Sequence, residues 1–342
     1  MITIKIATVF TLTCVMTVSH AAQARHDDSV AQSAESSPAE DVGQSLAVAG
    51  SGIDAKKIAD EFAATVKGVV PTQINTNQAG NNANLELWRK GTQDLLSYQN
   101  WGKNTYIRNV SNVLKKAGVD LSGISVPSWI NSLNQQQLYA TAISPLHIIA
   151  AAHWHPAIGQ AIFFVDAANH PISRQIVSAQ QIIDPKGGLT DLWVASLSEA
   201  LPESIKPFKV LPAQDRSFVD DIPIPAWIAQ GGLGTVSVLW TATGANDAAA
   251  YQPPSKGFDV SFSRHDGAYA GWNSTVHGGS GSPIFVVIDH QPVLVSILHY
   301  MSGTSFFGGP SVADLSEQIN KAMAKLQGGS SNYRLTVFAE KP

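Results

Sequence analysis

The sequence predicts an all-β fold with helical segments before and after the strands. This prediction rests on a change in hydrophobic period at Val119. Beyond that residue, short runs rich in β-branched and aromatic residues alternate with Gly, Pro, Asn and Asp, which is typical of a β-sandwich or a barrel. The expected strands cover residues 138–149, 161–165, 172–177, 192–197, 235–243, 258–262, 284–288 and 293–298. The last two are joined by Asp289-His290-Gln291, so we expect them to form a hairpin.

Helical spacing characterises the segments on either side of the strands. In residues 54–67, Ile58, Phe62 and Val66 recur every fourth residue, as one buried helix face requires. The other helical patterns cover residues 85–96, 105–117 and, after the strands, 311–326. We interpret residues 51–118 as a small helical extension. The sequence leaves open whether this extension is a propeptide, a docking element or simple packing.

The N-terminal region has the features of an export signal followed by a linker. Residues 1–24 combine Lys5, an apolar run and the A-x-A site Ala22-Gln23-Ala24, which predicts a secretory signal peptide. The chain's 1 cysteine, Cys14, lies within that signal. Residues 25–50 have few large apolar side chains, so we expect a disordered linker. The predicted location is periplasmic or extracellular, without stable membrane insertion once the signal is removed.

Composition argues against several classes of function. The 342 residues carry a formal net charge of -4, and only 14% of them are charged. Nucleic-acid binding usually requires a concentrated Lys/Arg face, so no nucleic-acid partner is expected. The sequence contains no H-E-x-x-H zinc motif and no phosphate-binding G-x-x-x-x-G-K-[ST] loop. We therefore expect no metal and no cofactor, and we expect a monomer.

Three segments contain residue types suited to nucleophilic catalysis, in the chain order His, Asp, Ser. They are Ala151-Ala152-His153, Asp191 with the apolar run that follows it, and Gly278-Gly279-Ser280-Gly281-Ser282-Pro283. A serine hydroxyl is a weak nucleophile, and a histidine with a pKa near neutrality can act as its base. A carboxylate behind the imidazole fixes the ring tautomer and stabilises the imidazolium. This order distinguishes the chain from subtilisins and α/β-hydrolases.

These segments resemble the signature regions of chymotrypsin-like serine peptidases of the bacterial type. Ala151-Ala152-His153 is similar to the family's A-A-H, and Gly278-Gly279-Ser280-Gly281-Ser282-Pro283 is similar to the G-N-S-G-S-P of glutamyl endopeptidases. The resemblance implies two six-stranded antiparallel β-barrels within residues 119–342. It also implies hydrolysis of protein or peptide substrates through an acyl-enzyme. The site residues that it implies are the triad His153, Asp191 and Ser280, the oxyanion-hole residues Gly278 and Ser280, and the substrate-binding residues Ser274 and His299.

Each assignment has a competitor in the sequence. His147 and His155 flank His153, Asp184 precedes Asp191, and Ser282 follows Ser280. His299 also has an ordinary structural interpretation, as a barrel histidine with a backbone partner. For the whole chain, the alternative is a non-catalytic binding or adhesion protein on the same scaffold, because a fold does not guarantee a function. An α/β-hydrolase is disfavoured because G-x-S-x-G is absent around Ser280.

Overall fold

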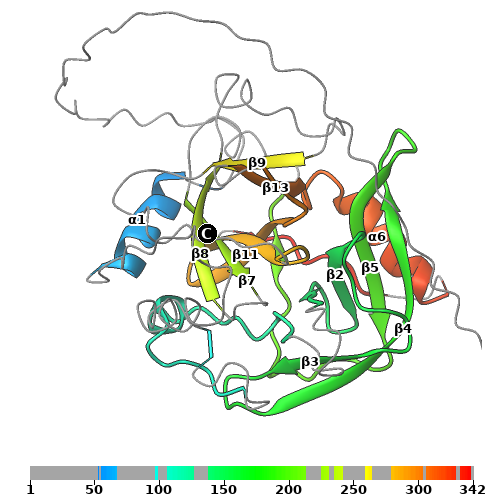
Figure 1. Ribbon diagram of the computed structural model, residues 1–342, viewed down its shortest axis with the longest axis horizontal. Helices are drawn as coiled ribbons and strands as arrows, with labels where there is room; N and C mark the ends of the chain where they lie inside the picture. Colours follow the sequence, from blue (N-terminus) through cyan, green and yellow to red (C-terminus); the bar gives the residue numbers. More distant parts are fainter. Residues whose placement is uncertain are drawn as a thin grey trace, which may run out of the picture. The chain divides into compact units, whose positions relative to one another are not determined.

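The structure is a computed structural model that describes residues 53, 55–67, 97–98, 106–126, 138–212, 225–230, 235–241, 259–263, 279–302, 306–328 and 332–339. Strands dominate these residues, and the few helices are short (Figure 1). The all-β prediction is therefore confirmed. The described strands form two sheets, one of five strands and one of eight.

The five-stranded sheet has the order β1-β2-β5-β4-β3. Its strands are β1 (Thr141–Ala142), β2 (His147–Ala151), β3 (Ala161–Val165), β4 (Pro171–Ile183) and β5 (Leu189–Leu197). The long strand β4 pairs with β3 through its first residues and with β5 through the rest, with register shifts after Ile176 and after Gln181. Such shifts mark bulges, which bend a strand and curl the sheet. The predicted single strand over 138–149 is instead two strands, because a turn at Ser144-Pro145 interrupts it.

The eight-stranded sheet has the order β12-β13-β9-β8-β7-β10-β11-β6. Its strands are β6 (Lys209–Val210), β7 (Pro225–Gln230), β8 (Thr235–Thr241), β9 (Asp259–Ser263), β10 (Pro283–Ile288), β11 (Gln291–Ile297), β12 (Tyr300–Ser302) and β13 (Phe306–Pro310). The hairpin expected between β10 and β11 is present. Asp289 and His290 form its tip with φ of 52° and 58°, as in a two-residue turn that matches the strand twist. Strands β6, β7, β12 and β13 were not predicted.

Buried side chains form a core within each sheet and a third core between the sheets. Ile148, Phe164 and Ala195 belong to the core of the five-stranded sheet. Ile228 and Val286 belong to that of the eight-stranded sheet. The largest cluster combines residues of both sheets, including Ile149, Val194, Trp227, Phe285 and Leu294. The two sheets therefore share one core, and residues at its edge can meet.

Helices cover the sheets at both ends of the described chain. Helix α1 (Ala55–Val66) buries Ile58, Phe62 and Val66, the face expected from the sequence. The aromatic rings of Phe62 and Trp227 lie 5.4 Å apart, so α1 packs on β7. Helix α6 (Ser316–Leu326) runs along β4 and β5 (Figure 1). It begins five residues later than the predicted 311–326.

The helix predicted over 105–117 is wrong for most of its length. Only α3 (Val113–Lys116) is helical, and Val110 is exposed rather than buried. The Asn112 carboxamide accepts the N–H groups of Leu114 and Lys115, so it caps a helix that begins after it. Upstream, Arg108 donates to the Asp166 carbonyl at 3.0 Å and to the Val165 carbonyl, which holds the chain in a non-helical path.

Other predictions lie outside the described residues. These are the signal peptide, the linker at 25–50 and the helix at 85–96. Within the described part of the chain, no helix has the length and apolar character needed to cross a bilayer.

Candidate functional site

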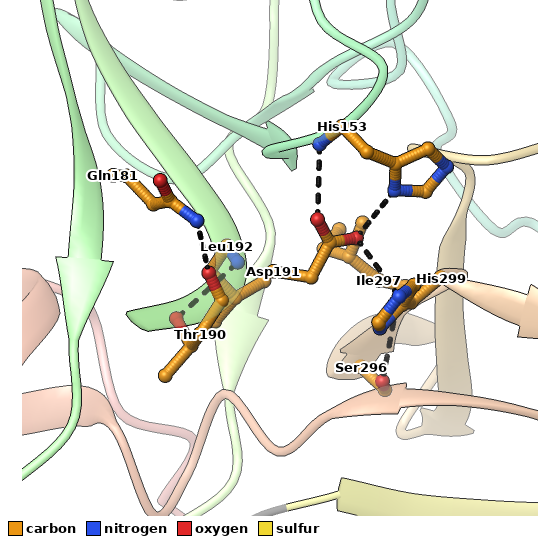
Figure 2. Close-up of polar contacts among 8 residues, drawn as sticks. All are labelled: His153, Gln181, Thr190, Asp191, Leu192, Ser296, Ile297 and His299. Atoms are coloured by element: carbon orange, nitrogen blue, oxygen red, sulfur yellow. Dashed lines mark hydrogen bonds and ion pairs between the residues drawn. The ribbon is translucent and has the colours of Figure 1, made fainter. Parts of the chain in front are cut away.

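Strand pairing brings Asp191 and His153 together. Strand β2 pairs antiparallel with β5 so that Ala151, the last residue of β2, lies opposite Leu192. His153 follows the end of β2 by two residues, and Asp191 lies within β5 one residue before Leu192, so the two residues meet at the same end of this strand pair. Around Asp191, the Gln181 amide donates to the Thr190 carbonyl at 2.6 Å and the Thr190 hydroxyl donates to the Ile182 carbonyl at 2.9 Å. Both bonds tie the start of β5 to β4, and Figure 2 shows the one between Gln181 and Thr190.

The Asp191 carboxylate holds His153 at two points. The backbone N–H of His153 donates to Asp191 Oδ1 at 2.9 Å, and the ring Nδ1 lies 2.6 Å from Asp191 Oδ2. A third bond, from Ala152 N–H to the Asp191 carbonyl at 2.9 Å, fixes the preceding residue. The Asp191 side chain is 12% exposed, whereas that of His153 is 44% exposed. The imidazole is therefore accessible, and the carboxylate that orients it is largely buried.

This contact determines the chemistry available to His153. A carboxylate can only accept, so the shared proton is on Nδ1, and in the neutral ring Nε2 carries the free lone pair. The hydrogen bond to Asp191 raises the pKa of His153 above 6.5, because the carboxylate stabilises the imidazolium more than burial disfavours it. His153 can therefore accept a proton at Nε2, and the Asp191 carboxylate stabilises the imidazolium that results.

Ser280 lies in a turn that packs directly against the His153 loop. Gly281, which follows it, has a φ of +89°. A Cβ at Gly281 would lie 3.3 Å from the Tyr139 carbonyl oxygen and 3.5 Å from that of Trp154. The turn and the His153 loop are therefore in backbone contact. Among the described residues, no hydrogen bond joins the His153 ring to the Ser280 hydroxyl.

His299 is a second histidine at the carboxylate. Its Nε2 lies 3.6 Å from Asp191 Oδ2, and the rings of His299 and His153 are 5.3 Å apart. Figure 2 shows the carboxylate between the two imidazoles. The sequence identified His299 as a residue of interest but did not predict this contact. The signal that could have found it is the β10–β11 pairing, which places Pro283 opposite Ile297 and so brings His299 beside the Ser280 turn.

The competing residues have other environments. His147 is fully buried in β2, with Nδ1 2.8 Å from the Ser144 hydroxyl, and burial lowers its pKa to about 4. The His155 ring stacks on Trp193 at 4.4 Å. The Asp184 carboxylate accepts the N–H groups of Lys186 and Gly188, both at 2.8 Å, and so stabilises its own turn. Ser282 is 0% exposed, so an external molecule cannot reach it, whereas Ser280 is half-buried.

Among the residues that the structure describes, the two histidines and Asp191 also form a group that could hold a metal ion. One ligand atom from each lies within 4.8 Å of the others. Two ligands of a tetrahedral zinc ion stand about 3.3 Å apart, because zinc–nitrogen bonds are about 2.0–2.1 Å long. The 2.6 Å between His153 Nδ1 and Asp191 Oδ2 is shorter than that and fits a shared proton. The arrangement therefore favours a hydrogen-bonded pair, and a metal would require His153 to turn.

Two predicted site residues, Ser274 and Gly278, lie outside the described residues. No protein-family model matches the chain, and no curated protein matches it.

Proposed function

We propose that the protein is an exported serine endopeptidase of the chymotrypsin-like type. His153 is its base, Asp191 orients that base, and Ser280 is the nucleophile. In this proposal the five-stranded sheet and the eight-stranded sheet correspond to the two barrels of that family, whose members have six strands in each barrel. The substrate is a protein or peptide, and the reaction needs no metal and no cofactor.

One observation supports this proposal above all others. A largely buried carboxylate holds an exposed imidazole by both its backbone and its ring nitrogen. A purely structural histidine does not need an oriented, solvent-accessible ring with a raised pKa. Ser280, which is half-buried, stands on a turn packed against the same loop.

The proposed reaction follows from these positions. Ser280 Oγ attacks the scissile carbonyl carbon while its proton passes to His153 Nε2, and Asp191 stabilises the resulting imidazolium. That proton then passes to the leaving amine as the C–N bond breaks, which leaves an acyl-enzyme. Water hydrolyses the ester by the same route in reverse. The absence of a hydrogen bond between His153 and Ser280 is compatible with this reaction, because catalytic bonds often tighten only when substrate binds.

Labelling with a fluorophosphonate probe tests the proposal. The probe phosphonylates a serine only when a neighbouring base activates it, so we expect the wild-type protein to be labelled at Ser280. Ser280→Ala should abolish labelling, and Ser282→Ala should leave the modified site unchanged, as judged by peptide mass spectrometry. A folded wild-type protein that resists labelling would favour the alternative, a non-catalytic binding protein on this scaffold. Labelling at a residue other than Ser280 would reject the assigned nucleophile.

A further inference from the structure

We infer that His299 is a positioning residue that holds Asp191 from the opposite sheet and couples the Ser280 turn to the carboxylate. This inference rests on the proposed function, because it assigns His299 a part in the same site. It gives His299 a different role from the substrate contact that the sequence suggested.

The side-chain geometry is the first support. His299 Nε2 faces Asp191 Oδ2, the oxygen that also accepts from His153 Nδ1. A carboxylate oxygen has two lone pairs, so it can interact with both imidazoles. At 3.6 Å the contact with His299 is longer than a direct hydrogen bond, and it therefore acts through charge and dipole. Since Asp191 is only 12% exposed, water screens this interaction less than it would at the surface.

The backbone around His299 is the second support. The His299 N–H donates to the Gly308 carbonyl at 2.8 Å, which ties the residue to β13. Leu298 exchanges bonds with the nucleophile's turn: its N–H donates to the Ser282 carbonyl at 2.9 Å, and its carbonyl accepts from Gly281 N–H at 2.9 Å. His299 is thus joined through its backbone to the segment that carries Ser280. Its side chain reaches Asp191, which belongs to the other sheet.

The same geometry argues against His299 as a reader of acidic substrate side chains. Such a residue must direct a ring N–H toward the substrate. In the structure, Nε2 faces Asp191 and Nδ1 is buried. Positioning is therefore the role that the ring orientation supports.

The rate of fluorophosphonate labelling separates the two roles, because the probe presents no acidic side chain. His299→Leu removes the N–H groups at similar volume, and His299→Gln keeps one donor of similar reach. His170→Leu is the matched control, since it breaks another His–Asp pair, with Asp166 at 3.2 Å in the β3–β4 turn. We expect labelling of His299→Leu to slow by about tenfold or more, because small displacements of an orienting group reduce reaction rates strongly. His299→Gln should recover most of the rate, and His170→Leu should match the wild type.

A labelling rate of His299→Leu equal to that of wild type would overturn the inference. If His299→Leu does not fold, His299→Asn replaces it, because the shorter amide falls short of Asp191. A wild type that is not labelled contradicts the proposed function, and NMR then tests the positioning role independently. The His153 Nδ1–H resonance should shift or broaden in His299→Leu but not in His170→Leu. An unchanged resonance in both variants rejects the positioning role.

Discussion

The two sheets bring their site residues into place by different means. The five-stranded sheet supplies His153 and Asp191, and a side-chain carboxylate bonded to one backbone and one ring nitrogen fixes their relative position. The eight-stranded sheet supplies Ser280 and His299, and backbone bonds and a glycine conformation hold the turn between them. The first half of the site therefore depends on charge, and the second depends on backbone shape.

This difference predicts that the two halves fail differently. Replacing the orienting group in the five-stranded sheet should change reactivity with little loss of stability. Crowding the turn in the eight-stranded sheet should disturb both.

Asp191→Asn addresses the charge-dependent half. An Asn amide can donate to His153 Nδ1, which favours the wrong tautomer and removes the partner of the imidazolium. We expect fluorophosphonate labelling to slow by about 10⁴-fold while the fold persists. Asp184→Asn is the control, since that carboxylate accepts only within its own turn in the same sheet. Equal labelling of the two variants would show that Asp191 does not orient the base.

Gly281→Ala addresses the shape-dependent half. The added methyl group would lie 3.3 Å from the Tyr139 carbonyl oxygen in a residue whose φ is +89°, so the turn must move. We expect labelling to slow by about 100-fold, as for other small displacements of reacting groups. Gly159→Ala is the matched control, with a φ of +85° but no atom within 4 Å. It should destabilise the protein by about 1–2 kcal/mol without affecting the labelling rate. If Gly281→Ala and Gly159→Ala are labelled at similar rates, close packing of the turn is not required for the reactivity of Ser280.

The sequence predicted the local parts of this site better than the contacts between sheets. The strands flanking His153 and Asp191 were expected because apolar runs with β-branched residues identify strands wherever they pair. The Asp191–His299 contact was not expected, because it depends on how the two sheets pack. Likewise, hydrophobic spacing predicted a helix over residues 105–117, yet long-range bonds from Arg108 to Val165 and Asp166 outweigh the local preference. Hydrophobic spacing contains no information about such partners.

Acid should destabilise the five-stranded sheet through His147. This side chain is fully buried in β2, and burial lowers its pKa to about 4 from 6.5. The unfolded chain therefore binds a proton more readily than the folded one, so stability is complete above pH 6.5 and decreases as the pH falls toward 4. The shift corresponds to a loss of about 3 kcal/mol by pH 4. Urea unfolding at pH 7 and pH 4 measures this loss. Between pH 7 and pH 4, the free energy of unfolding of His147→Gln should fall by less than that of wild type. Equal decreases in the two proteins would exclude His147 as the cause.

The pH dependence of labelling should report His153 in the same sheet. Its pKa is raised above 6.5 by the hydrogen bond to Asp191. In the proposed reaction the ring must be neutral to accept the Ser280 proton. The labelling rate should therefore fall about tenfold per pH unit below a midpoint that lies above 6.5, and level off at higher pH. Measuring the rate between pH 5 and pH 9 gives the midpoint. A midpoint below 6.5 would mean that Asp191 does not stabilise the imidazolium in solution.

The smallest effect is expected where α1 meets the eight-stranded sheet. The Glu61 carboxylate accepts the N–H groups of Asp289 and His290 at 2.8 and 2.6 Å, and so caps the turn between β10 and β11. Glu61→Gln can satisfy only one of these donors, and we expect a loss of about 1–2 kcal/mol in urea unfolding. Glu317→Gln on α6 is the control, because that side chain is 72% exposed and pairs only with Lys321 on the surface.

The Glu61 result also bears on the role left open for the N-terminal extension. Helix α1 contributes Phe62 and Val66 to the core shared by the two sheets. A propeptide whose removal leaves a stable enzyme should not share that core, so a measurable loss in Glu61→Gln favours a helix retained in the mature protein. Mass spectrometry of the labelled, mature chain provides the direct comparison. An N-terminus beyond residue 67, combined with equal stabilities of Glu61→Gln and Glu317→Gln, would instead identify the helix as a segment that the active protein does without.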